Sequence, residues 1–463
     1  MKPRDTIVLV NPISNEGHLD SWHVLFATLL TRAGWRVIAM TSDPAGLARK
    51  LQAKGRTPGD TLRIVGTVES SAAAANTRLV DRCRKVWLDW NVYCEAAQYQ
   101  RYWRQQASAG QPRTKVAPLV ESLKQAALRG LMHLTAALHA RYGQLRKRSA
   151  SGRALAPAAF SPNDFRDQVN AVIAQHPQEI CAVLNMYIDA YAPDQASWEG
   201  FAFRENLPWV ALCITPTDSP QQGYYTVPSY QGTLLLDESL TARYRAALPS
   251  KQFEYLPDIT ETVLPEQASS LSRELVDAAA GRKIVFMGGS IGKQKNLARW
   301  FQLIALADPQ EWFFVQIGRI NKNNLTTEDA LALEKVLAAP PTNLYIRPEY
   351  LADERFFNEM ISISSVIFAV YRDFGRSSNM LSKAAYFEKP ILVASNCLMG
   401  DRVERYRIGK AVSQDDTLSM HEGLLAVGSI EDLQSNFQHY RNDFSETIMQ
   451  QKLSNFLRQC IAY

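Results

Sequence analysis

The sequence predicts an α/β protein built from two doubly wound parallel sheets, and two observations support this fold class. In both halves of the chain, short apolar stretches alternate with amphipathic stretches of helical spacing, starting at residues 7–10 and again at residues 282–288. The length of 463 residues also exceeds what one ordinary hydrophobic core accommodates. Because 46% of the residues are hydrophobic and 21% are charged, the chain is globular in composition. We therefore expect two Rossmann-like domains.

The first half starts with the strand at 7–10, followed by a polar turn and a helix predicted over about 19–33. A second strand, WRVIAMTS, comes next, and later strands begin at Ile180 and Pro208. Strands separated by helices are typical of βαβ units, so these strands are expected to run parallel with helices on both faces of the sheet.

The second half repeats the pattern from Arg282 onward, with four or five strand and helix units in succession. The expected organisation has three parts. An N-terminal domain spans 1–260 and contains a helical insertion at about 78–155. A C-terminal domain spans 261–435, and a last helix within 436–463 packs back on the N-terminal domain.

The predicted insertion carries the positive charge of the chain. Residues 78–153 contain 15 Lys and Arg against 4 Asp and Glu, whereas the whole chain has a net charge of only +5. Its Trp and Tyr side chains alternate with cations, and two interpretations stay open. The rings can form the core between the helices, or residues 78–150 can lie on an anionic membrane surface. Nucleic-acid binding is not expected, since no recognised nucleic-acid module accompanies the segment.

The cysteines and the apolar stretches bear on the cellular compartment. The six cysteines are widely spaced and include no CxxC pair, so we expect free, buried thiols and no zinc site. The sequence has no run of about 18 apolar residues, and its first ten residues lack the long apolar core of a secretory signal. We expect a cytoplasmic protein, with a peripheral position on the inner face of the membrane as the alternative.

The turn after the first strand is a candidate ligand site, because ligands bind beyond the carboxyl ends of parallel strands. Gly17 lets the backbone approach a ligand, and His18 at the mouth of the helix can accept a proton from a hydroxyl group near neutral pH. A helix cap followed by a surface histidine is the alternative. Three polar side chains after later strands are candidates for acceptor binding: Asn185, Asp189 and Thr217.

Three stretches carry a resemblance to known glycosyltransferases. GHLDSWHVLFATLLTRAGWRVIAMTS is similar to the first βαβ unit of two-domain GT-B glycosyltransferases. IVFMGGSIGKQKNLARWFQLI and SSNMLSKAAYFEKPILVASN resemble the donor-nucleotide domain of glycosyltransferase family 4. The resemblance implies the GT-B fold and a UDP- or GDP-linked sugar as donor. This donor is a co-substrate, and no separate cofactor is expected.

A departing diphosphate needs its charge balanced by cations and backbone amides. The resemblance assigns this role to Lys295, with Gly289 and Ser290 in the glycine-rich turn before it. The arginine of the family aligns with Ser290, so Lys293 or Arg319 is expected to supply the missing charge. No metal ion is needed in this scheme, because cations and amides of the protein replace it.

The acidic pair of the family is replaced in this chain. Its two positions are Gly375 and Lys383, and Asp373 is the nearest carboxylate to the first. Hydroxyl and amide groups at the following helix start are expected to hold the β-phosphate, with an ordinary helix cap as the alternative. These groups belong to Ser377, Ser378 and Asn379.

The sequence therefore predicts a glycosyltransferase that moves a sugar from a nucleoside-diphosphate sugar to a hydroxyl group of a small-molecule, glycan or lipid-linked acceptor. In inverting enzymes of the family 1 type, the histidine of a Gly-His loop is the general base, and His18 matches that position. Asp373 is the second candidate catalytic residue, and retaining or inverting chemistry stays open. The alternatives are a sugar-nucleotide epimerase and a non-catalytic binding or scaffold protein of the same fold.

Overall fold

The structure, a computed structural model, describes residues 4–13, 18–53, 55–67, 160–349, 351 and 353–462. For residues 18–20 it describes the backbone alone. The predicted insertion at about 78–155 lies outside these ranges, so its helices and its membrane contact stay predictions.

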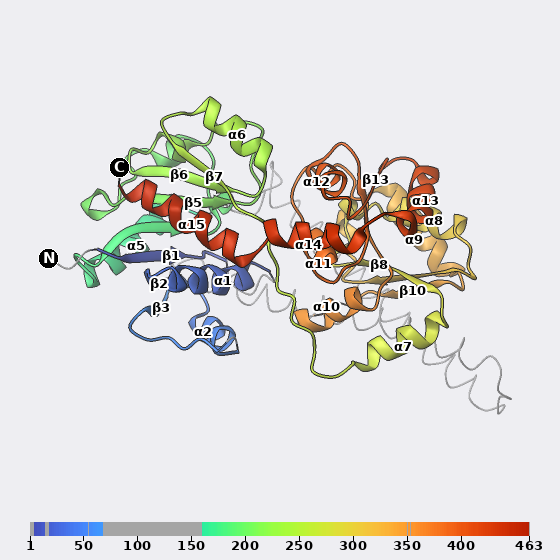
Figure 1. Ribbon diagram of the computed structural model, residues 1–463. Helices are drawn as coiled ribbons and strands as arrows, with labels where there is room; N and C mark the ends of the chain where they lie inside the picture. Colours follow the sequence, from blue (N-terminus) through green and yellow to red (C-terminus); the bar gives the residue numbers. More distant parts are fainter. Residues whose placement is uncertain are drawn as a thin grey trace, which may run out of the picture. The chain divides into compact units, whose positions relative to one another are not determined.

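The N-terminal sheet of the described chain has seven parallel strands in the order β3-β2-β1-β4-β5-β6-β7. The strands are β1 (Thr6–Val10), β2 (Arg36–Thr41), β3 (Leu62–Gly66), β4 (Ile180–Asn185), β5 (Trp209–Cys213), β6 (Tyr230–Leu235) and β7 (Gln252–Tyr255). The chain runs outward from β1 to β3 and resumes on the other side of β1 with β4 (Figure 1). The carboxyl ends of β1 and β4 therefore mark the topological switch point of this sheet.

Helices pack on this sheet and connect its strands: α1 (His18–Arg32), α2 (Pro44–Ala53), α5 (Pro162–Gln175) and α6 (Glu238–Ala247). The last helix, α15 (Glu446–Ile461), contacts α1, β5 and β7. Two ion pairs accompany that contact, Arg32 with Glu446 at 2.7 Å and Lys452 with Glu254 at 2.6 Å. The end of the chain thus packs on the N-terminal sheet.

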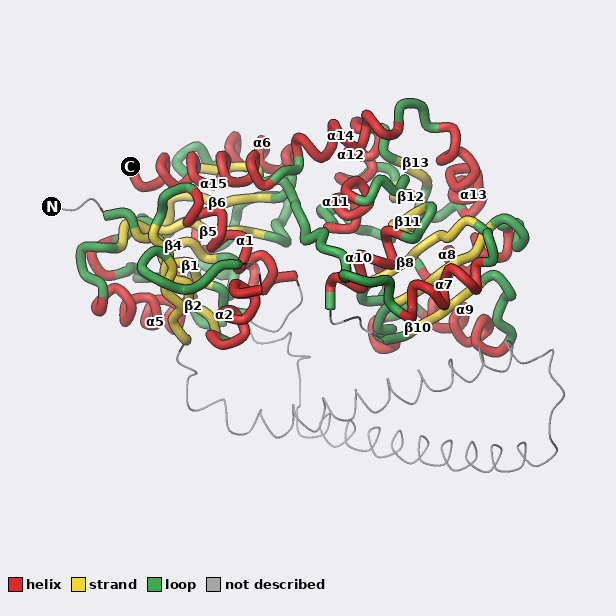
Figure 2. Tube along the Cα trace, turned by 60° about the horizontal axis from the view of Figure 1, so that its bottom comes forward, coloured by secondary structure: helices red, strands yellow, loops and turns green. Residues whose placement is uncertain are grey.

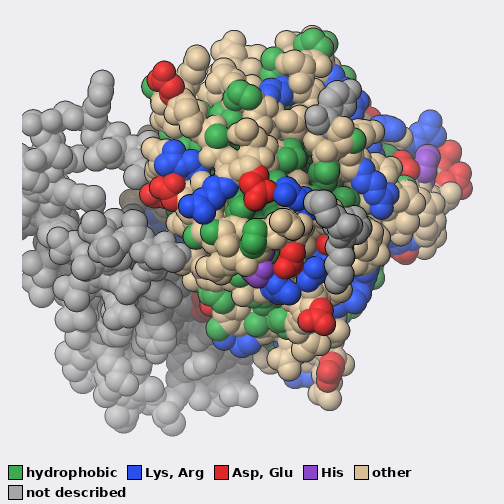
Figure 3. Space-filling model, turned by 90° about the vertical axis from the view of Figure 1, so that its left-hand side faces the viewer, with side chains coloured by type: hydrophobic (Ala, Val, Ile, Leu, Met, Phe, Trp, Pro, Cys, Tyr) green, Lys and Arg blue, Asp and Glu red, His purple; other side chains and the backbone are tan. Residues whose placement is uncertain are grey.

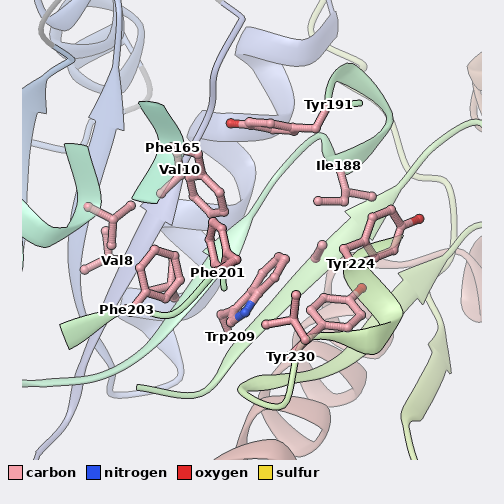
Figure 4. Packing of buried hydrophobic residues seen from close by; sticks show 14 of the residues in the cluster. Val8, Val10, Phe165, Ile188, Tyr191, Phe201, Phe203, Trp209, Tyr224 and Tyr230 are labelled. Carbon is pink, nitrogen blue, oxygen red and sulfur yellow. The ribbon is translucent and has the colours of Figure 1, made fainter. Parts of the chain in front are cut away.

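Aromatic side chains form much of the core beside this sheet (Figure 4). Trp209 of β5 is fully buried, stacks on Trp198 with ring centroids 5.6 Å apart, and lies 4.4 Å from the ring of Tyr230. Phe165 of α5 reaches the same cluster, 5.7 Å from Trp209. Since burial of one such ring contributes about 2 kcal/mol, the cluster holds the strands β4 to β6 and their carboxyl ends in place.

The C-terminal sheet has six parallel strands in the order β10-β9-β8-β11-β12-β13 (Figure 2). They are β8 (Lys283–Gly288), β9 (Trp312–Ile317), β10 (Leu344–Arg347), β11 (Val366–Ala369), β12 (Ile391–Ala394) and β13 (Gly409–Val412). The switch point of this sheet lies between β8 and β11. The predicted fold class, two doubly wound parallel sheets, is confirmed.

The helices of this half alternate with its strands: α7 (Ser270–Ala279), α8 (Leu297–Leu306), α9 (Thr327–Ala338), α10 (Glu354–Ser362), α11 (Asn379–Tyr386), α12 (Leu398–Tyr406), α13 (Thr417–Ala426) and α14 (Leu433–Asp443). Several begin at a capping side chain that accepts a hydrogen bond from a first-turn amide, as with Ser269 before α7 and Thr326 before α9. On one side of the sheet α8 contacts α9 and α13, while α11 contacts α10 and α14.

Candidate functional site

The carboxyl ends of β8 and β9 meet through glycine backbone. Gly289 has a φ of 94°, and a Cβ on Gly318, whose φ is 147°, would lie 1.8 Å from the carbonyl oxygen of Gly289. No residue with a side chain fits there without moving the backbone. Beyond this point the two loops stay together, because the amide of Ile291 donates to the carbonyl of Arg319 at 2.9 Å. The glycine-rich turn is thus a fixed backbone surface next to the switch point.

Lys295 spans that switch point. Its ammonium group donates to the carbonyl of Gly288, the last residue of β8, at 2.9 Å and to the hydroxyl of Tyr371, just beyond β11, at 2.8 Å. It also lies 4.1 Å from the centroid of the Tyr371 ring, a cation–π contact. An ammonium group has three hydrogens, so one is left for a ligand. The structure therefore places a half-buried cation where a ligand of this fold class binds.

The other candidate cations lie at the surface. Lys293 and Arg319 are exposed, and so is the neutral side chain of Ser290 in the glycine-rich turn. None of the three side chains makes a hydrogen bond or an ion pair with the residues that the structure describes. Lys293 and Lys295 share a short 3₁₀ turn, Lys293–Lys295, which is followed by Asn296 at a φ of 54°. The turn separates the two lysines, since only Lys295 folds back onto the strand ends.

The start of α11 presents one engaged and one capping hydroxyl group. Ser377 donates to the carboxylate of Asp258 at 2.8 Å and accepts from Arg402 at 2.7 Å. Ser378 caps α11 and accepts from the amide of Met380 at 3.4 Å. Asn379 is the first residue of the helix and is half-buried. The Met380 amide is therefore capped, and the Leu381 amide donates to the carbonyl of Ser378 at 3.0 Å. Among the described groups at this helix start, the amide of Asn379 and the hydroxyl hydrogen of Ser378 are left for an anion.

Asp373 is held by a neighbouring loop. Its backbone has a φ of 48°, its amide donates to the side-chain carbonyl of Gln414 at 2.9 Å, and its carboxylate accepts from the Gln414 amide at 3.0 Å. This reciprocal pair ties the loop after β11 to the loop after β13. The carboxylate is exposed.

Lys383, at the second position of the acidic pair, is fully buried. Its ammonium group donates to the carboxylate of Glu354 and to the carbonyl of Glu261, both at 2.9 Å, and to the side-chain oxygen of Asn358. Burial lowers the pKa of Lys383, and the Glu354 carboxylate opposes that shift. All three hydrogens have partners, so this lysine has a structural role.

A buried network that the sequence does not reveal fixes the start of α8. Arg372 donates to Asp329 at 2.9 Å and to the side-chain oxygen of Asn296 at 2.9 Å. Asp329 in turn accepts from the amide of Ala298, in the first turn of α8, at 2.9 Å. Its carboxylate occupies the helix N-terminus that an anion would otherwise use. This leaves α11 as the helix start next to the switch point that can receive a phosphate.

Acid should weaken this network. Burial alone would raise the pKa of Asp329, but hydrogen bonds from Arg372, Thr326 and Ala298 outweigh it and lower the pKa below 3.8. A carboxyl group with a lowered pKa stabilises the fold above its unfolded pKa, and that contribution is lost as the pH falls through the folded value. Asp329→Asn should cost about 3 kcal/mol at neutral pH. In melting curves, the difference from wild type should shrink below about pH 4.

The exposed residue Asp415 provides the control, since Asp415→Asn should follow the wild-type curve at every pH. A difference between wild type and Asp329→Asn that stays constant from pH 7 to pH 3 would contradict this account of the network.

One acceptor-side candidate lies at the switch point of the N-terminal sheet, between β1 and β4. α1 begins at His18, but Gly17 and the side chain of His18 lie outside the residues that the structure describes. Asn185 is the last residue of β4, is fully buried, and accepts from the amide of Tyr187 at 2.9 Å. Only Asn185 among the described candidates thus lies at the carboxyl end of β4, next to β1.

Asp189 and Thr217 are both engaged by partners in the loop after β5. Asp189 accepts from the amides of Ile214 and Thr215 at 2.7 and 3.0 Å, and from the hydroxyl of Thr215 at 2.8 Å. Thr217 donates to the carbonyl of Ser219 at 2.7 Å. These contacts shape the loop after β5, and Asp189 has few acceptor positions left for a ligand.

Among the described residues, no group of three His, Cys, Asp or Glu side chains is arranged to hold a metal ion. In the same part of the chain, no helix combines the length and the apolar character needed to cross a bilayer. The described cysteines are free thiols: Cys181, Cys213, Cys397 and Cys460. On the face in Figure 3, basic and acidic side chains of the described residues are interspersed.

Two Rossmann-like parallel sheets in one chain define the GT-B fold, and known structures agree with that assignment. No protein-family model matches the sequence, and neither does any curated protein sequence. A glycosyltransferase from Rickettsia africae ESF-5 superposes with a TM-score of 0.58 at 9% identity, covering 100% of this chain and 99% of that one.

Two further solved structures match over nearly the full length. Sucrose-phosphate synthase from Thermosynechococcus elongatus has a TM-score of 0.56 at 12% identity, covering 99% of this chain and 100% of that one. The Anabaena protein HepE, in complex with UDP and glucose, has a TM-score of 0.53 at 11% identity, covering 98% of this chain and 99% of that one. At such identities the likeness shows the fold.

Proposed function

We propose that this protein is a glycosyltransferase that moves a sugar from a nucleoside-diphosphate sugar to an acceptor hydroxyl group. The observation that supports it most is the position of Lys295, whose ammonium group joins the ends of β8 and β11 with one hydrogen to spare. The helix α11, which follows β11, begins at the same edge of the sheet with the amide of Asn379. A cation and an amide at a helix start together suit a diphosphate.

In this mechanism the acceptor hydroxyl loses its proton to His18, and its oxygen forms a bond with the anomeric carbon of the donor. The bond between that carbon and the diphosphate oxygen breaks, and the diphosphate leaves with the electron pair. Lys295 and the amide at the start of α11 stabilise the charge that develops on it. Lys293, two residues before Lys295, and Arg319, in the loop after β9 that is bonded to Ile291, add further positive charge. Protein cations take the place of a metal ion, and the donor is UDP- or GDP-linked.

The acceptor would bind beside the N-terminal sheet. Asn185, with the turn around Gly17, would contact an acceptor that is a small molecule, a glycan or a lipid-linked sugar. A lipid-linked acceptor would fit with the basic segment 78–150 on an anionic membrane surface. Flotation with liposomes that contain or lack anionic lipid tests this part, and a protein that never floats would favour a soluble acceptor.

A panel of sugar nucleotides tests the proposal. We expect one or more UDP- or GDP-sugars to raise the melting temperature and to release nucleoside diphosphate slowly in the absence of acceptor. An epimerase would instead return a sugar nucleotide with inverted configuration, and it would need acid–base carboxylates at the site. Asp373 is paired with Gln414, which disfavours that role. A protein that neither binds nor turns over any member of the panel would be the scaffold alternative.

His18→Ala separates chemistry from donor binding. The variant should transfer sugar about 100 to 1,000-fold more slowly, because general base catalysis contributes factors of this size, while nucleoside-diphosphate affinity should stay at the wild-type value. His421→Ala is the matched control, since that histidine lies on α13 in the C-terminal half. Unchanged transfer by His18→Ala would remove His18 from the mechanism.

A further inference from the structure

Arg402 of α12 is a buried cation that neither the sequence patterns nor the proposed chemistry uses. Only 2% of it is exposed. One end of its guanidinium group donates to Ser377 at 2.7 Å, and the other donates to the carbonyl of Leu236 at 2.7 Å and to Glu238 at 2.8 Å. An arginine is always charged, so this geometry fixes a full charge in a buried position.

Aromatic rings hold the guanidinium group in place. It lies 5.0 Å from the ring centroid of Phe444, at the junction of α14 and α15, and 5.7 Å from that of Tyr255, at the end of β7. Arg402 therefore contacts three separate segments besides the one that holds Ser377. A side chain fixed from so many directions has little freedom to move.

Ser377 passes this constraint on to α11. A serine hydroxyl has one hydrogen, and because that hydrogen goes to Asp258, Ser377 accepts from Arg402. The carbonyl of Asp258 accepts in turn from the hydroxyl of Ser382, one turn further along α11. Asp258 thus binds the chain before and after the first turn of α11, at Ser377 and at Ser382, and Arg402 also binds the first of these two serines.

We infer that Arg402 is a positioning residue for the donor diphosphate, which acts through Ser377 by fixing the position of the Asn379 amide and the Ser378 hydroxyl at the start of α11. This inference rests on the proposed function, because it takes these two groups to be the phosphate donors. Without the guanidinium group of Arg402, the residues before the Ser378 cap are free to rotate. The two groups then bind the β-phosphate less well, whereas contacts to the nucleoside are untouched.

The test measures nucleotide affinity by calorimetry with UDP and GDP, and with the corresponding monophosphates, which lack the β-phosphate. The variants are Arg402→Lys, Ser377→Ala and the double variant, with Arg405→Met as control, since Arg405 is on the same helix but exposed. Each single variant should weaken diphosphate binding about tenfold, the value of one charge-assisted hydrogen bond, and leave monophosphate binding unchanged. The double variant should bind as the single variants do, because both break one chain of contacts.

Three outcomes would overturn the inference while the proposed function stands: wild-type diphosphate affinity in the single variants, equal losses for diphosphate and monophosphate, or additive losses in the double variant. If wild-type protein binds neither UDP nor GDP, the proposed function fails and the inference fails with it. Should Arg402→Lys not fold, Ser377→Ala gives the same comparison, because it removes only one hydroxyl group.

Discussion

Lys383→Glu should destabilise the protein by about 4 kcal/mol or more, although glutamate is the residue that the resembled family carries at this position. The lysine is fully buried, and its partners are all oxygen atoms, from Glu354, Asn358 and Glu261. A carboxylate at position 383 would lie next to the carboxylate of Glu354. It would also leave the oxygen atoms of Asn358 and Glu261 without a hydrogen-bond donor. Denaturant unfolding monitored by circular dichroism measures the loss.

Two companion variants make this result specific. Lys383→Met keeps the length of the side chain and loses only the ammonium group, so it should destabilise less than the glutamate variant. Lys335→Glu places the same charge change at an exposed site on α9 and should cost at most about 0.5 kcal/mol. Near wild-type stability of Lys383→Glu would mean that the pocket accommodates the acidic residue, contrary to the contacts described above.

Lys295→Ala should slow sugar transfer about 100-fold, the usual effect of removing one group that stabilises charge developing in a transition state. Its ammonium group is the described cation that touches both strand ends at the switch point, with Gly288 and Tyr371 as its partners. The rate of release of nucleoside diphosphate from the preferred donor measures the effect.

The matched control is Lys283→Ala. Lys283 lies at the start of β8, the strand whose last carbonyl binds Lys295, and there it is exposed and pairs with Glu311 at 2.8 Å. It should keep the wild-type rate. Tyr371→Phe keeps the ring under the ammonium group and loses the hydroxyl, so it should cause a smaller loss than Lys295→Ala. Equal rates for Lys295→Ala and wild type would disprove the role of Lys295.

The fold was predictable because its signals are local. A parallel strand buried on both faces appears as a short apolar run, such as Ile7 to Val10, and the helix after it has its own periodicity and caps. The helix predicted over about 19–33 agrees with α1 at His18–Arg32. The resemblance also placed Lys295 in the loop after a strand, where the structure has it.

The partners of the candidate side chains were not predictable, because they come from distant parts of the chain. Nothing near Ser377 indicates that its hydroxyl is bound by Asp258 and Arg402, which are 119 and 25 residues away. The same holds for Asp189, whose donors follow β5, and for the network of Arg372 with Asp329. A sequence shows which side chains follow strand ends, and tertiary contacts decide which of them are left for a ligand.

A crystal structure of the protein with UDP or GDP bound shows whether Lys295 and the start of α11 hold the diphosphate. We expect oxygen atoms of the diphosphate within about 3 Å of the ammonium group of Lys295 and of the first amide of α11. A bound nucleotide whose diphosphate lies away from both groups would contradict this expectation.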